Sequence, residues 1–213
     1  MIKQLSQTAR KIKTSKQEIL LQILFVFILP VLLLQTGLIP ISARIWVLVI
    51  TVSLFIILLL KEKWTLDMLH IEKYNFKKFV FPYALFTIIS VIVISFFSEK
   101  IGREEFAHWW LNSHFIYLFF VVSIFQEVAY RGYLIPALRK IIASPVLIII
   151  INALIFAYMH SIFGNYQLNL LLAFVGGLGF AAMYIKYPNL LLITLSHAVL
   201  NFSVVLYGFF IIR

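Results

Sequence analysis

The chain has 213 residues, of which 63% are hydrophobic and 12% are charged, and its mean hydropathy is +1.03. Soluble domains are about 45–50% apolar and about 25% charged, so this composition excludes a soluble globular protein and indicates a polytopic membrane protein. The absence of cysteine excludes disulfide bonds and thiolate chemistry. The net charge of +10 comes from cations beside apolar segments, which favours membrane lipids of an anionic inner leaflet, and not nucleic acid, as the partner.

Long apolar segments follow one another along the chain, and a spanning helix needs about 20 apolar residues. Seven spans are predicted, at residues 19–37, 43–60, 79–97, 115–138, 144–161, 168–186 and 189–210. The predicted fold class is therefore all-α, a polytopic transmembrane helical bundle of about seven spans.

Three regions are predicted along this bundle. They are a basic membrane-surface segment at 1–18, transmembrane helices without a motif at 19–106, and a core with three polar motifs at 107–213. Polar connectors at 61–78 and 98–114 separate the spans, and the first of them is a candidate interfacial helix. Trp109 and Trp110 in the second connector are typical of a membrane interface.

Basic residues are unevenly distributed between the two ends of the predicted spans. With the N-terminus inside, thirteen lysine and arginine residues fall on the inner side and four on the outer side. The positive-inside rule then predicts a cytoplasmic N-terminus. The membrane is expected to be a bacterial cell membrane. The turns near residues 141 and 188 are inside on this topology, which places the motifs toward the outer half of the membrane.

One carboxylate, Glu127, lies well inside a predicted span, in the stretch "SIFQEVAYRGYL". An ionisable group at this depth costs roughly 2.5–3.5 kcal/mol on insertion scales, so it is a candidate functional residue. Arg131 lies one helical turn later and can pair with it on the same face. A purely structural ion pair is the alternative interpretation.

Further polar residues occur in the fifth and seventh predicted spans, in "FAYMH" and "HAVLN". They are His160, His197 and Asn201, the last two spaced four residues apart. At 1.5 Å per residue from the nearest turns, these residues and Glu127 lie about 14–25 Å deep, within one slab of the membrane. We therefore expect all four to converge on one polar cleft. The small residues Ala173, Gly177 and Ala181 of the sixth span are interpreted as helix packing.

These motifs resemble those of the CAAX-protease and bacteriocin-processing family of intramembrane proteases, also called the CPBP or Abi family. "QEVAYR" is similar to the family's EExxxR motif, "FAYMH" to FxxxH and "HAVLN" to HxxxN, over roughly residues 107–205. The resemblance implies that His160 helps to activate a water molecule and that His197 and Asn201 stabilise the oxyanion. It also implies that Glu127 pairs with Arg131.

Gln126 departs from this pattern, because it stands where the family has the first glutamate of the pair. A carboxamide lacks the basicity of a carboxylate, so water activation is in doubt. Three explanations stay open: Glu127 is the base, the chain is a natural non-catalytic relative, or glutamate was replaced on purpose to trap substrate. Pairing with Arg131 argues against the first, because it makes Glu127 a poorer base.

Two classes of function follow from the resemblance. The first is an intramembrane endopeptidase that cleaves a membrane-associated peptide or protein precursor, such as a CAAX-type C-terminus, a bacteriocin leader or a signalling peptide. The second is an inactive relative that acts as a membrane binding protein or in bacteriocin self-immunity. No cofactor and no tightly bound zinc is expected, although Glu127, His160 and His197 are the ligands that zinc would use.

Overall fold

The computed structural model describes residues 14–65, 73–103, 113–162 and 166–209, and every regular element in these ranges is a helix. The all-α class is therefore confirmed. Within the described ranges, five helical stretches are long and apolar enough to cross a membrane: Lys16–Gln35, Ile41–Lys61, Phe76–Lys100, Pro145–Ile162 and Gln167–Lys186. A sixth, Leu190–Leu206, is apolar but shorter.

The N-terminal part of the bundle consists of three membrane-crossing stretches. The first stretch comprises α2 (Lys16–Ile23), the π-helix η1 (Leu24–Ile28) and α3 (Leu29–Gln35). The second comprises the 3-10 turn η2 (Ile41–Ala43) and α4 (Arg44–Lys61), and the third is α5 (Lys73–Lys100).

The C-terminal part carries the motifs. It comprises α6 (Ser113–Glu127), the π-helix η4 (Val128–Leu134), α7 (Ile135–Ile141), α8 (Pro145–Met159), the 3-10 turn η5 (His160–Ile162), α9 (Tyr166–Lys186) and α10 (Leu190–Leu206).

Local sequence sets where several of these helices begin and end. Ser15 and Glu18 form a reciprocal capping box at the start of α2, and Asn189 caps α10 by accepting a hydrogen bond from the amide of Leu192 at 2.9 Å. Gly37 follows α3 with a φ of 74°. This left-handed backbone costs glycine little, so the chain can turn sharply there.

The fourth predicted span, 115–138, is not one regular α-helix. It divides into α6, the π-helix η4 and α7, with Pro136 in the first turn of α7. Proline has no amide hydrogen to donate, which disturbs the hydrogen-bond ladder at this point. Asn152 of α8 donates a hydrogen bond to the carbonyl oxygen of Tyr130, at 2.8 Å, and so satisfies part of the π-helical backbone.

Other boundaries also differ from those predicted. Helix α5 begins at Lys73, inside the connector predicted at 61–78, and it ends at Lys100 instead of 97. The basic segment up to residue 13, most of the second connector with Trp109 and Trp110, and residues 66–72 of the first connector lie outside the described residues.

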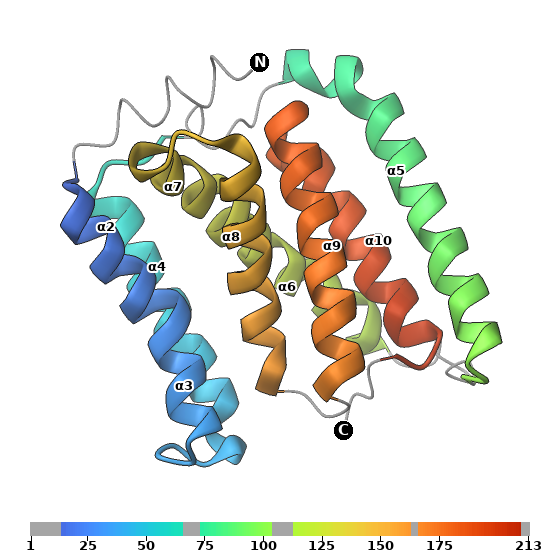
Figure 1. Ribbon diagram of the computed structural model, residues 1–213, viewed down its shortest axis with the longest axis horizontal. Coiled ribbons are helices and arrows are strands. Elements are labelled where there is room, and N and C mark those ends of the chain that lie inside the picture. Colours follow the sequence, from blue (N-terminus) through green and yellow to red (C-terminus); the bar gives the residue numbers. More distant parts are fainter. Residues whose placement is uncertain (1–13, 66–72, 104–112, 163–165, 210–213) are drawn as a thin grey trace.

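The helices pack as a single bundle around the motif-bearing elements. Figure 1 shows α8 and α9 side by side, with α6 passing behind them, α5 and α10 on one flank and α2, α3 and α4 on the other. A Cβ atom on Gly177 of α9 would lie 3.0 Å from the Cα atom of Ala153 in α8. Gly177 therefore lets these two helices approach closely, as its small size predicted.

A polar cluster joins the first two membrane-crossing stretches to the π-helix η4. The hydroxyl of Tyr133 donates to Oε1 of the Gln22 side chain, and Nε2 of the same side chain donates to Oε1 of Glu62 at 2.6 Å. Trp64 donates to the same carboxylate at 3.2 Å. Because Tyr133 is only 1% exposed, this cluster fixes η4 against helices that carry no motif.

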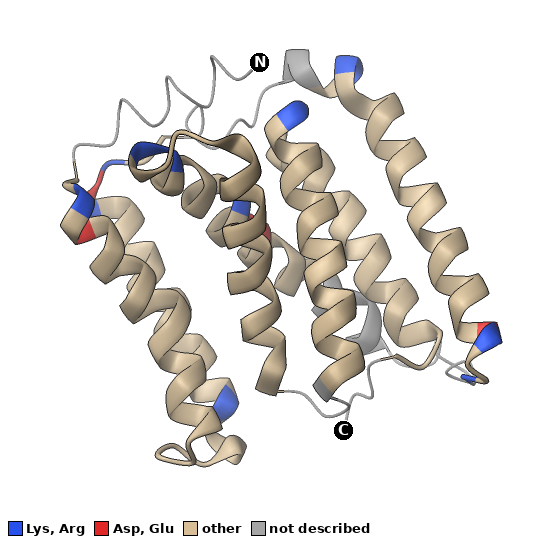
Figure 2. Cartoon of the chain, viewed as in Figure 1, with Lys and Arg blue, Asp and Glu red and all other residues tan. Residues whose placement is uncertain are grey.

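Basic residues gather at one end of the bundle. Figure 2 shows them at the start of α5, the end of α7 and the end of α9, with fewer at the opposite end. The α7–α8 and α9–α10 turns both lie at this basic end (Figure 1). The predicted turns near 141 and 188 therefore share one side, as the sequence indicated; the membrane orientation stays a prediction.

Cysteine labelling can test that orientation, because the chain has no native cysteine. Leu38, 76% exposed, follows α3 at one end of the bundle, and the exposed Ser144 precedes α8 at the other. With the basic end in the cytoplasm, a membrane-impermeant maleimide applied to intact cells should label Leu38→Cys and not Ser144→Cys. The reverse pattern would contradict the predicted topology, and permeabilised cells should label both variants.

Candidate active site

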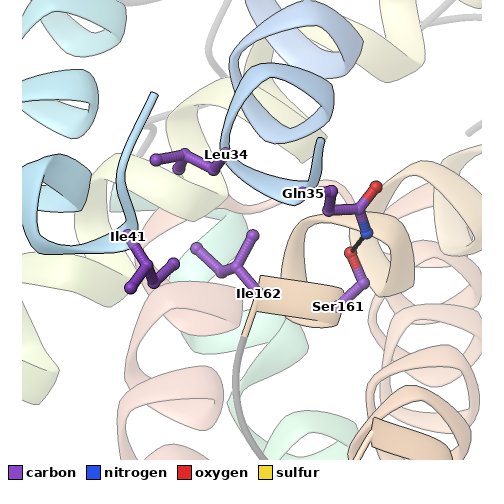
Figure 3. Close-up of a pocket in the computed structure, with 5 residues that line it drawn as sticks. All are labelled: Leu34, Gln35, Ile41, Ser161 and Ile162. Atoms are coloured by element: carbon purple, nitrogen blue, oxygen red, sulfur yellow. Dashed lines mark hydrogen bonds between the residues drawn. The ribbon is translucent and has the colours of Figure 1, made fainter. Parts of the chain in front are cut away.

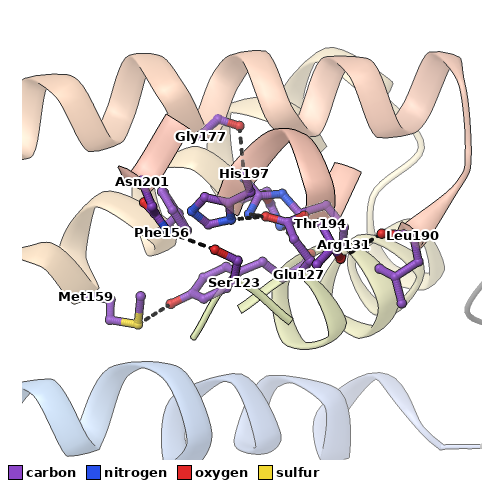
Figure 4. Close-up of polar contacts among 12 residues, drawn as sticks. Ser123, Glu127, Arg131, Phe156, Met159, Gly177, Leu190, Thr194, His197 and Asn201 are labelled. Atoms are coloured by element: carbon purple, nitrogen blue, oxygen red, sulfur yellow. Dashed lines mark hydrogen bonds and ion pairs between the residues drawn. The ribbon is translucent and has the colours of Figure 1, made fainter. Parts of the chain in front are cut away.

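The three motifs reach the middle of the bundle from three directions. Gln126 and Glu127 end α6, and Arg131 lies in the π-helix η4 that follows. His160 comes directly after α8, while His197 and Asn201 lie in α10. Figure 4 shows the polar contacts that connect these elements.

The carboxylate of Glu127 is the centre of the site. Its Oε1 atom accepts a hydrogen bond from Nη1 of Arg131 at 2.8 Å and another from Nδ1 of His197 at 2.6 Å. The side chains are 0% exposed for Glu127 and Arg131 and 1% exposed for His197. The pair of Glu127 and Arg131 was expected, and the structure adds His197, which joins the first motif to the third.

The buried charge of Arg131 has further partners. Its Nη2 atom donates to the carbonyl oxygen of Gly177 at 3.5 Å. Its guanidinium carbon lies 4.7 Å from the ring centroid of Phe156 and 5.2 Å from that of Phe180. Aromatic faces attract cations, so these rings help to keep the guanidinium charged inside the bundle.

Phe156, the first residue of the second motif, connects the two histidines. Its ring centroid lies 4.7 Å from that of His160 and 5.5 Å from that of His197. Its carbonyl oxygen also contacts Nδ1 of His160 at 2.8 Å. A carbonyl can only accept, so Nδ1 of His160 carries a hydrogen, and proton transfer to the neutral ring takes place at Nε2.

Asn201 reaches the site through a residue that the sequence reading missed. Its amide nitrogen donates to the hydroxyl of Ser123 at 3.0 Å, one turn before Glu127. Ser123 is completely buried. The residues Ser123, Glu127 and Arg131 recur every four positions, and this spacing was the signal that could have identified the serine.

Gln126 lies beside the charged group and is partly exposed. Its amide oxygen and the Oε2 atom of Glu127 are both buried, and neither has a hydrogen-bond partner in the part of the chain that the structure describes. Such oxygens are acceptors that a polar ligand or a water molecule can satisfy.

The charged centre of the site is enclosed. Glu127, Arg131 and His197 are shielded by surrounding side chains, and His160 is 9% exposed. Gln126 and Asn201 are partly exposed, and the expectation that the motif residues converge on one polar cleft stays a prediction. Enclosure results from the aromatic rings of Tyr130, Phe156 and Phe180, which pack around the charges.

The geometry does not favour a metal at this position. Nδ1 of His197 and Oε1 of Glu127 bind each other, and Arg131 places a positive charge on the same oxygen. Within the described ranges, no three histidine, cysteine, aspartate or glutamate side chains are grouped so that they could hold a metal ion. The expectation that no zinc is tightly bound stays a prediction.

Residues 108–203 match the family model of type II CAAX prenyl endopeptidase Rce1-like proteins. The match confirms the family resemblance. The Rce1-like region contains all three motifs and lies inside the core predicted at 107–213. No curated protein and no solved structure matches the chain.

The Rce1-like match defines the general character of the protein. It is an integral membrane protein, and its residues 108–203 are similar to the type II CAAX prenyl endopeptidases, which are hydrolases. The helices before residue 108 lie outside the match. Any role that they have in the site must be read from their contacts.

Proposed function

We propose that the protein is an intramembrane endopeptidase that cleaves a membrane-anchored peptide or protein precursor. The supporting observation is the hydrogen bond from His197 to Glu127, since it brings the first and third motifs together beside the ring of the second. An ion pair with only a packing role does not require this histidine.

Water activation is assigned to His160, with help from Gln126. The Nδ1–H group of His160 is held by the carbonyl oxygen of Phe156, so Nε2 is oriented to take a proton from water. The Gln126 amide oxygen accepts a hydrogen bond from the same water molecule but cannot remove its proton. The resulting hydroxide attacks the scissile carbonyl, and His160 then returns the proton to the leaving amine.

Oxyanion stabilisation is assigned to His197 and Asn201. Nδ1 of His197 donates to Glu127, so Nε2 can donate to the oxyanion only when the ring carries both of its protons. The Asn201 amide has two hydrogens and uses one for Ser123, leaving the other for the oxyanion. Glu127 is thus a positioning residue, and Arg131 holds its Oε1 atom in place through the contact at 2.8 Å.

The substrate is proposed to be a peptide that its own anchor holds in the membrane. The family description, a CAAX prenyl endopeptidase, favours a prenylated C-terminus over a bacteriocin leader or a signalling-peptide precursor. A suitable probe is a farnesylated peptide in which three uncharged residues follow the modified cysteine.

Substitution of His160 tests this function. His160→Ala should lower kcat/KM for cleavage of the farnesylated probe by about 10²–10⁴-fold, as expected for loss of a general base. Leu154→Ala is a matched control, because Leu154 lies in α8, the helix that directly precedes His160, and is 53% exposed. Equal cleavage rates for both variants, in chains with equal thermal stability, would exclude His160 as the base.

A second candidate function is a membrane binding or bacteriocin self-immunity protein. Gln126 favours it, because the side chain at the position of the first glutamate is not a base and Glu127 is already bound to Arg131 and His197. In that case the farnesylated probe binds without being cleaved.

A further inference from the structure

A pocket of about 510 Å³ lies next to the second motif, at the end of the bundle opposite the basic end. Leu34 and Gln35 of α3 and Ile41 of η2 line one side of it, and Ser161 and Ile162 of η5 line the other. Small-molecule and peptide sites commonly have volumes of about 300–1,000 Å³. Three of the five lining residues, Leu34, Gln35 and Ile41, come from helices that the family match does not cover.

The wall has two chemically different parts. Figure 3 shows the aliphatic side chains of Leu34, Ile41 and Ile162 on one side and the contact between Gln35 and Ser161 on the other. The Gln35 amide nitrogen donates to the Ser161 hydroxyl, which itself donates to the carbonyl oxygen of Tyr158 at 2.6 Å. No charged side chain is among these lining residues.

The position of this pocket connects it to the proposed chemistry. Ser161 directly follows His160, so the polar part of the wall begins one residue after the candidate base. Leu34 and Gln35 end α3, and Gly37 then turns the chain away toward η2. The pocket is therefore at the end of a membrane-crossing stretch, where a peptide attached to a lipid anchor leaves the apolar region.

We infer that this pocket binds the uncharged stretch of the substrate next to the scissile bond, with Gln35 as a specificity-determining residue; this inference rests on the proposed peptidase function. A carboxamide offers a donor and an acceptor, which suits the amide groups of an extended peptide. The aliphatic wall accepts an uncharged side chain, and a charged one would lose hydration there without gaining a partner.

Charge substitution at Gln35 tests the specificity. The kcat/KM of the farnesylated probe is compared with that of a matched peptide carrying lysine at the middle of its three terminal residues. Gln35→Glu should raise the kcat/KM of the lysine peptide relative to that of the uncharged probe about tenfold, which corresponds to 1.4 kcal/mol. Gln35→Lys should lower the relative kcat/KM of the lysine peptide. It should raise that of a peptide with aspartate at the same position. A substitution that only damages folding lowers all rates together, and that result overturns the inference.

Photo-cross-linking gives a measurement that is independent of cleavage. A benzoylphenylalanine at Ile41, which is 48% exposed, should cross-link the farnesylated probe, and excess unlabelled peptide should compete. The same group at Leu60, 72% exposed near the other end of α4, is the control. Cross-linking to lipid alone at position 41 would assign the pocket to an acyl chain and overturn the inference.

The two measurements separate the inference from the proposed function. Cleavage of the probe without cross-linking at position 41 would contradict the inference about the pocket and would still support the proposed peptidase function. Cross-linking without cleavage would support binding of the probe in the pocket. It would contradict the peptidase function and favour the second candidate, a membrane binding protein.

Discussion

Replacing Gln126 by glutamate is expected to raise peptidase activity by about 10²–10⁴-fold, the usual contribution of a general base. The side chains are nearly the same size, so the helix and the surrounding packing should be preserved. The amide oxygen of Gln126 is buried and has no partner within the described residues. A carboxylate at the same place can accept a proton from the water molecule that His160 is proposed to activate, which a carboxamide cannot.

The measurement is the rate of cleavage of the farnesylated probe in membranes containing each variant at equal amounts. The gain should disappear in the double variant Gln126→Glu, His160→Ala, because both groups are proposed to act on one water molecule. Gln126→Met has a similar length without the polar group and is the matched control. Equal activity of the original and Gln126→Glu chains, with both inactivated by Glu127→Gln, would instead identify Glu127 as the base.

Removing Arg131 alone is expected to destabilise the fold by about 3–5 kcal/mol, the usual cost of breaking a buried ion pair. In Arg131→Ala the carboxylate of Glu127 is left at 0% exposure without its cation. The substitution also removes contacts to Phe156 and Gly177. We expect a lower midpoint of thermal unfolding in detergent and a lower yield of folded protein.

A double variant separates charge from packing in this experiment. Glu127→Gln, Arg131→Met removes both charges and keeps long side chains, so it should recover much of the stability that Arg131→Ala loses. Activity should not recover, since His197 no longer has a carboxylate to orient it. If the double variant is as unstable as Arg131→Ala, packing and not the buried charge accounts for the loss.

Hydropathy predicted the membrane-crossing stretches well, because apolar length is a direct requirement of the bilayer. It did not predict the π-helix η4, since mean hydropathy carries no information about which carbonyl each amide binds. The start of α5 at Lys73 was missed for a related reason. Its first turns carry several lysines. In a prediction from hydropathy, polar residues at the end of a spanning helix cannot be told apart from a polar connector between two helices.

The site was partly predictable because its polar residues stand out in apolar spans. The ion pair between Glu127 and Arg131 follows from their spacing, but the bond from His197 depends on how α10 is rotated against α6. The carbonyl oxygen of Gly177 is a backbone atom, and no residue type signals its contact with Arg131. The role proposed for Gln35 could not be predicted from the sequence, because a single polar residue at the end of a membrane span is common.

The cluster of Gln22, Glu62 and Tyr133 bears on the order in which the bundle assembles during synthesis. Gln22 and Glu62 are made well before Tyr133, and N-terminal parts of a chain generally fold first. Polar groups in a membrane find partners early, since unsatisfied ones are costly there. The first two membrane-crossing stretches can therefore pair through the Gln22–Glu62 hydrogen bond before the later helices are inserted. The helix that carries the buried charges then inserts against a surface that already holds the acceptor for Tyr133.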